Sequence, residues 1–164
     1  VEGQSYDKAH SKWIEVISFS QGAEQSISMA RGVDVSGRGQ FLPFTFSHLV
    51  DKATPKLQLF CMNGQKIPKV EFAVCRAIAG VQVPVYEVKM ENVKIARAEI
   101  RTAAKALSQD GDAKVMPGPA PDAMEAIETV SLVAGKITWK STPIKPDNTK
   151  EGAVETSYNQ IENV

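Results

Sequence analysis

The sequence predicts a mainly β fold, an all-β sandwich or barrel with one short helix packed at its side or edge. Seven or eight short segments alternate between apolar and polar residues with the period of two that is typical of strands. Glycine, proline and small polar residues separate these segments, as they do between the strands of an all-β domain. One segment near residue 57 instead has apolar residues at helical spacing.

The stretch from residue 39 to residue 66 contains both kinds of element. Leu42, Phe44 and Phe46 alternate with a second set of side chains, as in a pleated strand, and the pattern breaks from Ser47 onward. This alternation predicts a strand that ends at a corner and leads directly into the helix.

The helix is expected to begin at Thr54, whose hydroxyl group suits the N-cap, with Pro55 in the first helical position. Asn63 and Gly64 supply a left-handed stop. Three apolar side chains fall on one helical face and are expected to contact the core: Leu57, Phe60 and Cys61.

The other predicted strands cover residues 13–20, 69–76, 81–92, 93–101, 128–134, 136–141 and 154–161. Ala79 and Gly80 mark a turn between two of them. The alternation slips at Val85 and Tyr86, beside Pro84, which predicts a β-bulge in the strand 81–92. Trp13, Trp139 and Tyr86 are interpreted as core residues, with a subunit contact as the alternative for Trp13.

Several segments do not have a simple strand pattern. Residues 13–20 carry apolar side chains on both faces, which indicates burial on both sides or contact with a partner subunit. Residues 21–38 are rich in serine, glycine, glutamine and alanine and are expected to form a projecting loop or an extended hairpin. Residues 102–107 are ambiguous between strand and helix, and residues 108–122 form a proline-rich loop.

Composition limits the classes of function. A chain of 164 residues is most simply one domain, here residues 1–164. Its formal net charge of zero argues against nucleic-acid binding by bulk charge. No run approaches the ~18 apolar residues of a membrane span, and no charged-then-apolar leader is visible. Two cysteines, Cys61 and Cys75, favour a reduced, cytoplasmic setting over a single disulfide.

No catalytic, cofactor-binding or metal-binding residues are predicted. Residues 32–39 are only a partial match to a phosphate-binding loop, because Arg38 and Gly39 stand where lysine and a hydroxyl residue are required. Histidine and cysteine spacings match no metal-ligand set. A nucleophilic pair of Cys61 and His48 is the enzymatic alternative, and it predicts a thiol that reacts readily with alkylating agents.

Several motifs together resemble the Hcp family, the haemolysin-coregulated tube subunits of bacterial type VI secretion. The most specific is Phe44-Thr45-Phe46 followed by Val50 to Leu57. The others follow in the family's order: the segment Val1 to His10, Trp13 to Val16, Phe19 to Gly22, Glu128 to Leu132, Ile137 to Trp139, Thr142-Pro143 and Gly152 to Val154. The resemblance covers nearly the whole chain.

The resemblance implies a compact β-barrel of two packed antiparallel sheets with one short flanking helix, similar to phage tail-tube proteins. It implies homohexameric rings that stack into a tube, a contractile sheath around it, a spike protein at its tip and small effector proteins in its lumen. Such a protein is cytoplasmic before firing and is then secreted outside the cell or into a target cell without a signal peptide. The alternatives are a phage-type tail tube protein and a monomeric ligand-binding β-barrel.

The resemblance also implies roles for individual residues. Ser20 occupies the place of a lumen-facing serine and is expected to contact the effector. The loop that contacts the next ring is expected to include Gln21, Gln25, Ser28, Arg31 and Arg38. The sequence departs from the family in three places: a strand usual ahead of Val1 is missing, the region 103–124 is longer and richer in alanine and proline, and Gln21 replaces a frequent aromatic residue.

Overall fold

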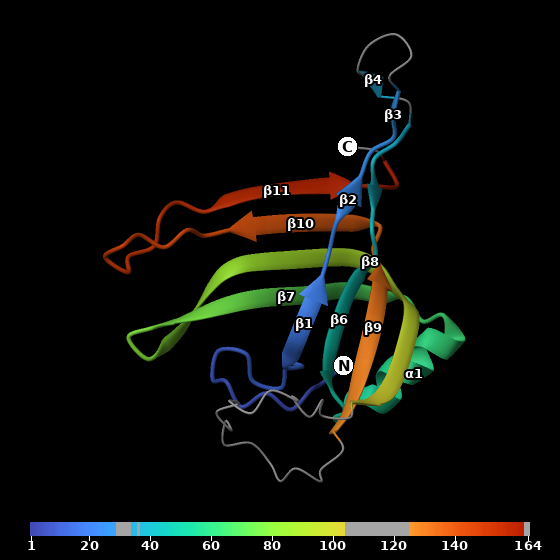
Figure 1. Ribbon diagram of the computed structural model, residues 1–164, viewed down its shortest axis with the longest axis horizontal. Coiled ribbons are helices and arrows are strands. Elements are labelled where there is room, and N and C mark those ends of the chain that lie inside the picture. The colour runs from blue at the N-terminus through green and yellow to red at the C-terminus, as the bar shows by residue number, and fades with distance from the viewer. Residues whose placement is uncertain (29–33, 36, 104–124, 163–164) are drawn as a thin grey trace, which may run out of the picture.

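The computed structural model describes residues 1–28, 34–35, 37–103 and 125–162 (Figure 1). The helix and strands follow one another in this order: β1 Val16–Ser20, β2 Ala23–Glu24, β3 Ile27–Ser28, β4 Asp34–Val35, β5 Gln40–Phe41, β6 Phe44–Leu49, α1 Thr54–Asn63, β7 Ile67–Ile78, β8 Val81–Ala103, β9 Glu125–Val133, β10 Lys136–Ser141 and β11 Val154–Asn159. The predicted class, mainly β with one short helix, is confirmed.

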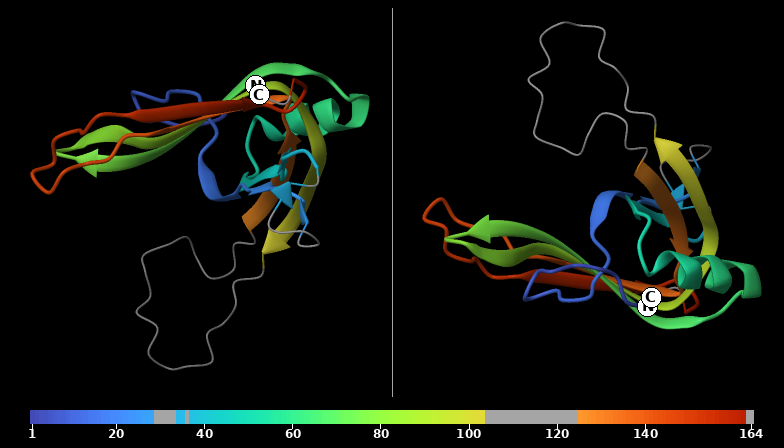
Figure 2. Two further views of the ribbon diagram at one scale, coloured as in Figure 1. Left: turned by 90° about the horizontal axis from the view of Figure 1, so that it is seen from above. Right: turned by 90° about the horizontal axis from the view of Figure 1, so that it is seen from below.

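Two antiparallel sheets share the long strand β8. The first sheet has the order β1-β6-β9-β8 and uses residues 94–103 of β8, and the second has the order β7-β8-β10-β11 and uses residues 81–93. Figure 2 shows β8 curving from one sheet into the other, so that the two sheets form a half-barrel. The long region 81–101, predicted as two adjoining strands, is therefore one continuous strand.

The corner between the sheets lies where β8 and the β9–β10 turn meet. Asn92 has a positive φ of 55°, a conformation that asparagine tolerates better than most residues. The backbone N–H of Gly135 donates to the carbonyl oxygens of Glu91 and Asn92, at 3.1 and 3.3 Å. A Cβ atom at Gly135 would lie 2.9 Å from the terminal methyl group of Ile161 and 3.3 Å from Cβ of Asn92, so a larger residue here would require the side chain of Ile161 to shift.

Local sequence signals in the second sheet are confirmed. Ala79 and Gly80 both have positive φ, of 48° and 78°, and join β7 to β8 through the two-residue turn that suits the twist of a hairpin. The register between the two strands shifts so that Val74 pairs with Tyr86 and Cys75 pairs with Pro84. Val85 is thus the extra residue of the predicted bulge.

The core lies between the concave faces of the two sheets and under α1. Its buried apolar side chains come from every part of the half-barrel: Phe44, Phe46, Ala53, Leu57, Val88, Met90, Val93, Ile95, Val130, Leu132, Ala134 and Ile137. Phe60, Cys61 and Trp139 are half-buried and pack against this cluster. The predicted apolar face of the helix is confirmed.

The helix begins differently from the prediction. Ala53 is the N-cap residue, with Pro55 in the first turn, and no side chain caps the helix. Thr54 Oγ1 instead accepts from the backbone N–H of Asp51, while Asp51 Oδ1 accepts from the N–H of Ala53, so the two side chains order the turn before the helix. Gly64 ends the helix in the left-handed conformation, as expected.

Other predicted boundaries also differ from the structure. The strand expected at 13–20 begins only at Val16, and its exposed Ile17 and Phe19 show that it is not buried on both faces. The central strand is divided into β5 and β6 around Pro43, which leaves Leu42 exposed. Cys75 lies within β7, which extends to Ile78, and both cysteines are free.

Residues 21–28, 34–35 and 37–42 leave the half-barrel as a projecting hairpin, which is prominent in Figure 1. β2 pairs with β5 at its base, and β3 pairs with β4 further out. The expectation of an extended hairpin at 21–38 is confirmed for the residues that the structure describes. The strand β8 runs to Ala103; the rest of 102–107 and all of the predicted loop 108–122 lie outside the described residues.

Candidate functional site

The face of the first sheet that points away from the core is covered by short hydroxyl side chains. Register places Ser20, Thr45 and Ser131 in one row across β1, β6 and β9. A second row contains Ser18, Ser47 and Thr129. We call these six residues the hydroxyl face. Neighbouring positions in the same strands, such as Phe46 and Val130, point to the core, because side chains alternate between the faces of a sheet.

The hydroxyl face is held together by hydrogen bonds between adjacent strands. The hydroxyl groups of Thr45 and Ser131 are 2.9 Å apart, and those of Ser47 and Thr129 are 3.0 Å apart. Cross-strand hydroxyl pairs of this kind stabilise a sheet modestly, and this is their structural role. Ser20 and Ser18 on the edge strand are exposed. On the adjacent strand β8, register places Arg97 beside Ser131 and Glu99 beside Thr129, and Arg101 donates to Thr129 Oγ1 at 3.5 Å. The hydroxyl face is therefore bordered on one side by a charged strand.

The outward face of the second sheet is charged instead. Three lysine–glutamate pairs lie on it: Lys69–Glu71, Lys89–Glu91 and Lys140–Glu87. Each of these three glutamates is partly exposed and paired with a lysine. The outward face of the first sheet therefore carries hydroxyl groups on β1, β6 and β9 and charged side chains on β8, whereas lysine–glutamate pairs lie across the outward face of the second sheet.

The projecting hairpin carries the residues predicted to contact the next ring. Gln25 Nε2 donates to the carbonyl oxygen of Gly37 at 2.6 Å and so joins the two arms of the hairpin. Ile27 is 56% exposed, although it is a large apolar side chain. Ser28 lies in β3 and Arg38 is exposed near β5. Arg31 lies outside the described residues.

Gln21 stands at the base of the hairpin, and its side chain points into the subunit. Its Oε1 atom accepts from Trp139 Nε1 at 3.1 Å and from the hydroxyl group of Tyr86 at 3.3 Å. Trp139 and Tyr86 belong to β10 and β8 of the second sheet. Burial raises the pKa of the Tyr86 phenol. Gln21 thus makes its contacts within its own subunit.

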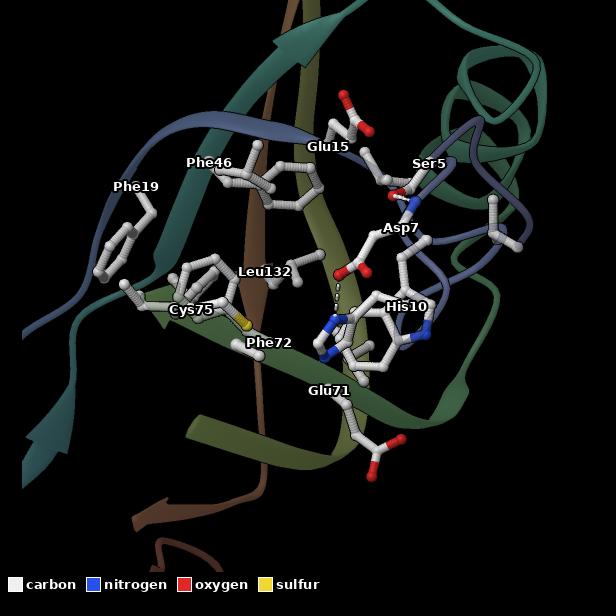
Figure 3. A pocket seen from close by; sticks show the side chains of 18 of the residues that line it. Ser5, Asp7, His10, Glu15, Phe19, Phe46, Glu71, Phe72, Cys75 and Leu132 are labelled. Carbon is white, nitrogen blue, oxygen red and sulfur yellow. Dashed lines mark hydrogen bonds and ion pairs between the residues drawn. The ribbon is translucent and has the colours of Figure 1, made fainter. Parts of the chain in front are cut away.

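A groove of about 740 Å³ lies on the open side of the half-barrel, lined by β1, β7 and residues before β1 (Figure 3). In the described residues β1 pairs only with β6, and β7 pairs only with β8, so each strand has one free edge. Phe72 fills the middle of the groove, with its ring centroid 4.5 Å from that of Phe19 and 5.0 Å from that of Phe44.

Polar groups stand at the mouth of this groove. His10 Nδ1 is 2.8 Å from Asp7 Oδ2, and this hydrogen bond is the main cause that lowers the pKa of Asp7. Cys75 lies on the wall formed by β7 (Figure 3), where burial raises the pKa of its thiol, with smaller contributions from the negative charges of Asp7 and Glu87. A raised thiol pKa is the opposite of what a nucleophilic cysteine requires.

A buried polar cluster joins β6, β9 and α1. His48 Nε2 is 2.9 Å from Glu128 Oε2, and Gln58 Nε2 donates to Glu128 Oε1 at 2.6 Å. His48 Nδ1 has no hydrogen-bond partner within the described residues and is 3.8 Å from Asp51 Oδ1. Sequence reasoning missed this cluster. The available signal was alternation, because His48 is in phase with Phe46 along β6.

These contacts do not form the pair that the enzymatic alternative requires. His48 is 1% exposed and one of its ring nitrogens is used by Glu128, while the other has no partner in the described part of the chain. Cys61 therefore receives no hydrogen bond from His48. No cluster of three or more potential metal ligands occurs among the described residues.

Comparison with known proteins gives a family match over most of the chain. The family model described as "Type VI secretion system effector, Hcp" matches residues 1–140. The chain belongs to the Hcp family. No curated protein sequence matches it significantly. The fold is shared with solved type VI secretion structures, so the predicted family and its keywords, type VI secretion, tube protein and β-barrel-like fold, are confirmed.

Three solved structures illustrate how far the Hcp likeness extends. The match to a structure of a type six secretion system protein has a TM-score of 0.81 at 23% sequence identity. It covers 100% of this chain and 93% of the chain in that structure. Hcp1 from Salmonella typhimurium has a TM-score of 0.69 at 21% identity, covering 99% and 91%. A type VI secretion effector from Yersinia pestis has a TM-score of 0.68 at 19% identity, covering 97% and 93%.

Within this Hcp chain, no helix among the described residues has the length and apolar character needed to cross a membrane.

Proposed function

We propose that the chain is a structural subunit of the type VI secretion inner tube, in which six copies close into a ring and rings stack. The protein acts by assembly and carries out no catalytic step. It is a single Hcp-like domain over residues 1–164. Membership of the Hcp family supports the role in type VI secretion. The proposal goes beyond this role to the assembly of six subunits into a ring and to the contacts that individual residues make in it.

The observation that carries the proposal is the projecting hairpin, residues 21–42 (Figure 1). Its base is paired and its outer part extends away from both sheets, with the apolar side chain of Ile27 exposed. A monomer gains nothing from exposing such a side chain on a narrow two-stranded ribbon, which is marginally stable alone. A neighbouring ring that packs against the ribbon would cover this side chain and order the ribbon.

Ring closure requires two different edges of the subunit that meet head to tail. The half-barrel supplies free edges at β1 and β7 and along the end of β8, in the described residues. The hydroxyl face is the surface that we assign to the lumen, where Ser20 contacts a small effector protein. Short hydroxyl groups bind weakly and keep their water, which suits cargo that must be released.

The proposal also includes the other partners of a type VI secretion tube. A contractile sheath surrounds the tube, a spike protein occupies its tip, and the charged face of the second sheet is the surface available to neighbours outside the lumen. The subunit is cytoplasmic before the sheath contracts and is then secreted with its effector.

Native mass spectrometry together with negative-stain electron microscopy tests the proposal. We expect a mass of six subunits and rings with an open centre, and we expect stacked rings at high protein concentration. A particle of one subunit at every concentration would contradict the proposal. Rings that stack without any type VI partner in the source genome would instead support a phage-type tail tube protein.

The groove between β1 and β7 favours a second candidate, a monomeric barrel that binds an apolar ligand. Its volume of about 740 Å³ is within the range of small-molecule sites, and Phe44, Phe46 and Phe72 line it. This candidate predicts a single-subunit mass and a stabilising shift in melting temperature with an apolar dye such as anilinonaphthalene sulfonate. A hexamer that shows no such shift excludes it.

A further inference from the structure

We propose that Gln21 is a positioning residue that sets the direction of the projecting hairpin by fastening its base to the second sheet. The inference rests on the proposed function in one respect, because the hairpin is taken to contact the next ring. The fastening itself is a property of the single subunit and is tested separately from assembly.

The position of Gln21 connects two parts of the molecule that the chain does not join directly. It follows β1 of the first sheet and precedes the hairpin strand β2. Its side-chain oxygen accepts from Trp139 Nε1 and from the Tyr86 hydroxyl, at 3.1 and 3.3 Å, and both donors belong to the second sheet. An amide oxygen has two lone pairs, so these two donors satisfy its accepting capacity.

Aromatic contacts fasten the other arm of the hairpin to the same place. The ring of Phe41, in β5, lies edge-on to Trp139 at 5.7 Å and to Tyr158 at 5.6 Å between centroids. The backbone N–H of Leu42 donates to the carbonyl oxygen of Gly22 at 2.9 Å and closes the base. Both arms of the hairpin therefore meet the second sheet beside Trp139.

The direction of the hairpin must be set at this base. A two-stranded ribbon has little stability of its own, and among the hairpin residues that the structure describes the strand pairing consists of the short ladders β2–β5 and β3–β4. A small rotation at the base moves the outer end of a ribbon much further than the base itself. Two contacts on separate arms, Gln21 and Phe41, prevent that rotation where one contact would allow a pivot.

The choice of a polar residue at position 21 has a physical reason. Trp139 and Tyr86 are half-buried, and an indole N–H or a phenol that loses its acceptor there is left with an uncompensated desolvation cost. An apolar side chain of similar size, such as leucine, would fill the space and leave both donors unpaired. A glutamate would keep an acceptor for both donors, with charge-assisted hydrogen bonds.

The test compares Gln21→Leu with Gln21→Glu in a Trp13→Phe background, in which Trp139 is the remaining tryptophan. We expect Gln21→Leu to change the emission of Trp139 and to raise the hydrogen exchange rate of the Leu42 amide at least tenfold by our estimate, about the effect of losing 1.4 kcal/mol. We expect Gln21→Glu to restore both values. The matched control is Gln82→Leu, an exposed glutamine on β8.

Assembly is measured in the same variants by electron microscopy. We expect Gln21→Leu to form rings whose stacks are shorter than those of the parent, and Gln21→Glu to recover their length. Ile27→Asp, which changes the outer hairpin and leaves the base intact, should shorten the stacks without changing the Leu42 amide. Tyr86→Phe removes one donor and provides the test, by Trp139 emission and Leu42 exchange, if Gln21→Leu does not fold; Trp139→Phe removes the other donor and is followed by Leu42 exchange alone.

The outcomes separate the two proposals. Unchanged Trp139 emission and Leu42 exchange in Gln21→Leu, or a Gln21→Glu variant that behaves like Gln21→Leu, would overturn the positioning role. A loosened base with stacks of normal length would support the fastening and contradict the contact between hairpin and neighbouring ring.

Discussion

His48 Nε2 lies 2.9 Å from Glu128 Oε2, and neither side chain reaches solvent. The two residues are 80 positions apart in the chain and face each other across β6 and β9, where register pairs them directly. Gln58 of α1 binds the second carboxylate oxygen. This cluster fastens the helix to the first sheet at the end of the sheet opposite the hairpin.

The first prediction concerns this cluster. We expect Glu128→Ala to lower the free energy of unfolding by about 3–5 kcal/mol, because it leaves His48 buried without its partner. Chemical denaturation followed by circular dichroism measures the change. The control is Glu71→Ala, which breaks an exposed pair with Lys69 and should cost at most about 1 kcal/mol. Equal losses in the two variants would contradict the prediction that the buried pair contributes more to stability than an exposed one.

The second prediction concerns the hydroxyl face. We expect Ser20→Glu to form normal rings and to retain less of a co-expressed small effector, because a carboxylate adds bulk and charge to the row of hydroxyl side chains that contains Ser20. Pull-down yield per ring measures the effect. Ser157→Glu is the matched variant, since Ser157 is exposed on the outward face of the second sheet, opposite Thr138. If both variants lost the effector alike, Ser20 would not be a specific contact.

The third prediction concerns the thiol of Cys75. Burial, and then the negative charges of Asp7 and Glu87, raise its pKa, so the reactive thiolate is scarce at pH 8. We expect iodoacetamide to modify it more slowly than a free cysteine at pH 8, with the rate still rising at pH values where free cysteine has reached its plateau. Mass spectrometry in a Cys61→Ser background measures the rate.

A second experiment tests why the pKa of the Cys75 thiol is raised. Removing the charge in Asp7→Asn should lower the pKa of Cys75 and speed its alkylation a few-fold at pH 8. Lys8→Gln, an exposed charge change next to Asp7, serves as the control. Alkylation of the parent protein at the rate of free cysteine would contradict the raised pKa.

Local sequence signals predicted much of the second sheet. The turn at Ala79 and Gly80, the bulge beside Pro84 and the stop at Gly64 depend on the conformational limits of one or two residues, and all three are present. The predicted start of the helix was wrong by one residue, because Ala53 and not Thr54 is the N-cap. Thr54 turned its hydroxyl to the preceding turn because Asp51 offered a backbone donor there.

Parts of the candidate site were also predictable. Alternation along β1, β6 and β9 indicates which side chains share a face, so the hydroxyl face could be derived once the strands were paired. The hairpin was expected from the absence of a strand period in residues 21–38. The inward direction of Gln21 was not expected, because the loop was interpreted as a whole and no local signal distinguishes its first residue.

The sequence by itself determined that the chain is mainly β, where its turns and bulge lie, and that one helix interrupts the strands, because these depend on neighbours within a few residues. Only the tertiary structure decided that β8 serves both sheets, that His48 meets Glu128 and that Gln21 reaches Trp139, 118 residues away. Such contacts depend on how strands bend and pair across the whole chain. Alternation assigns a side chain to a face and leaves its partner on the opposite element unspecified.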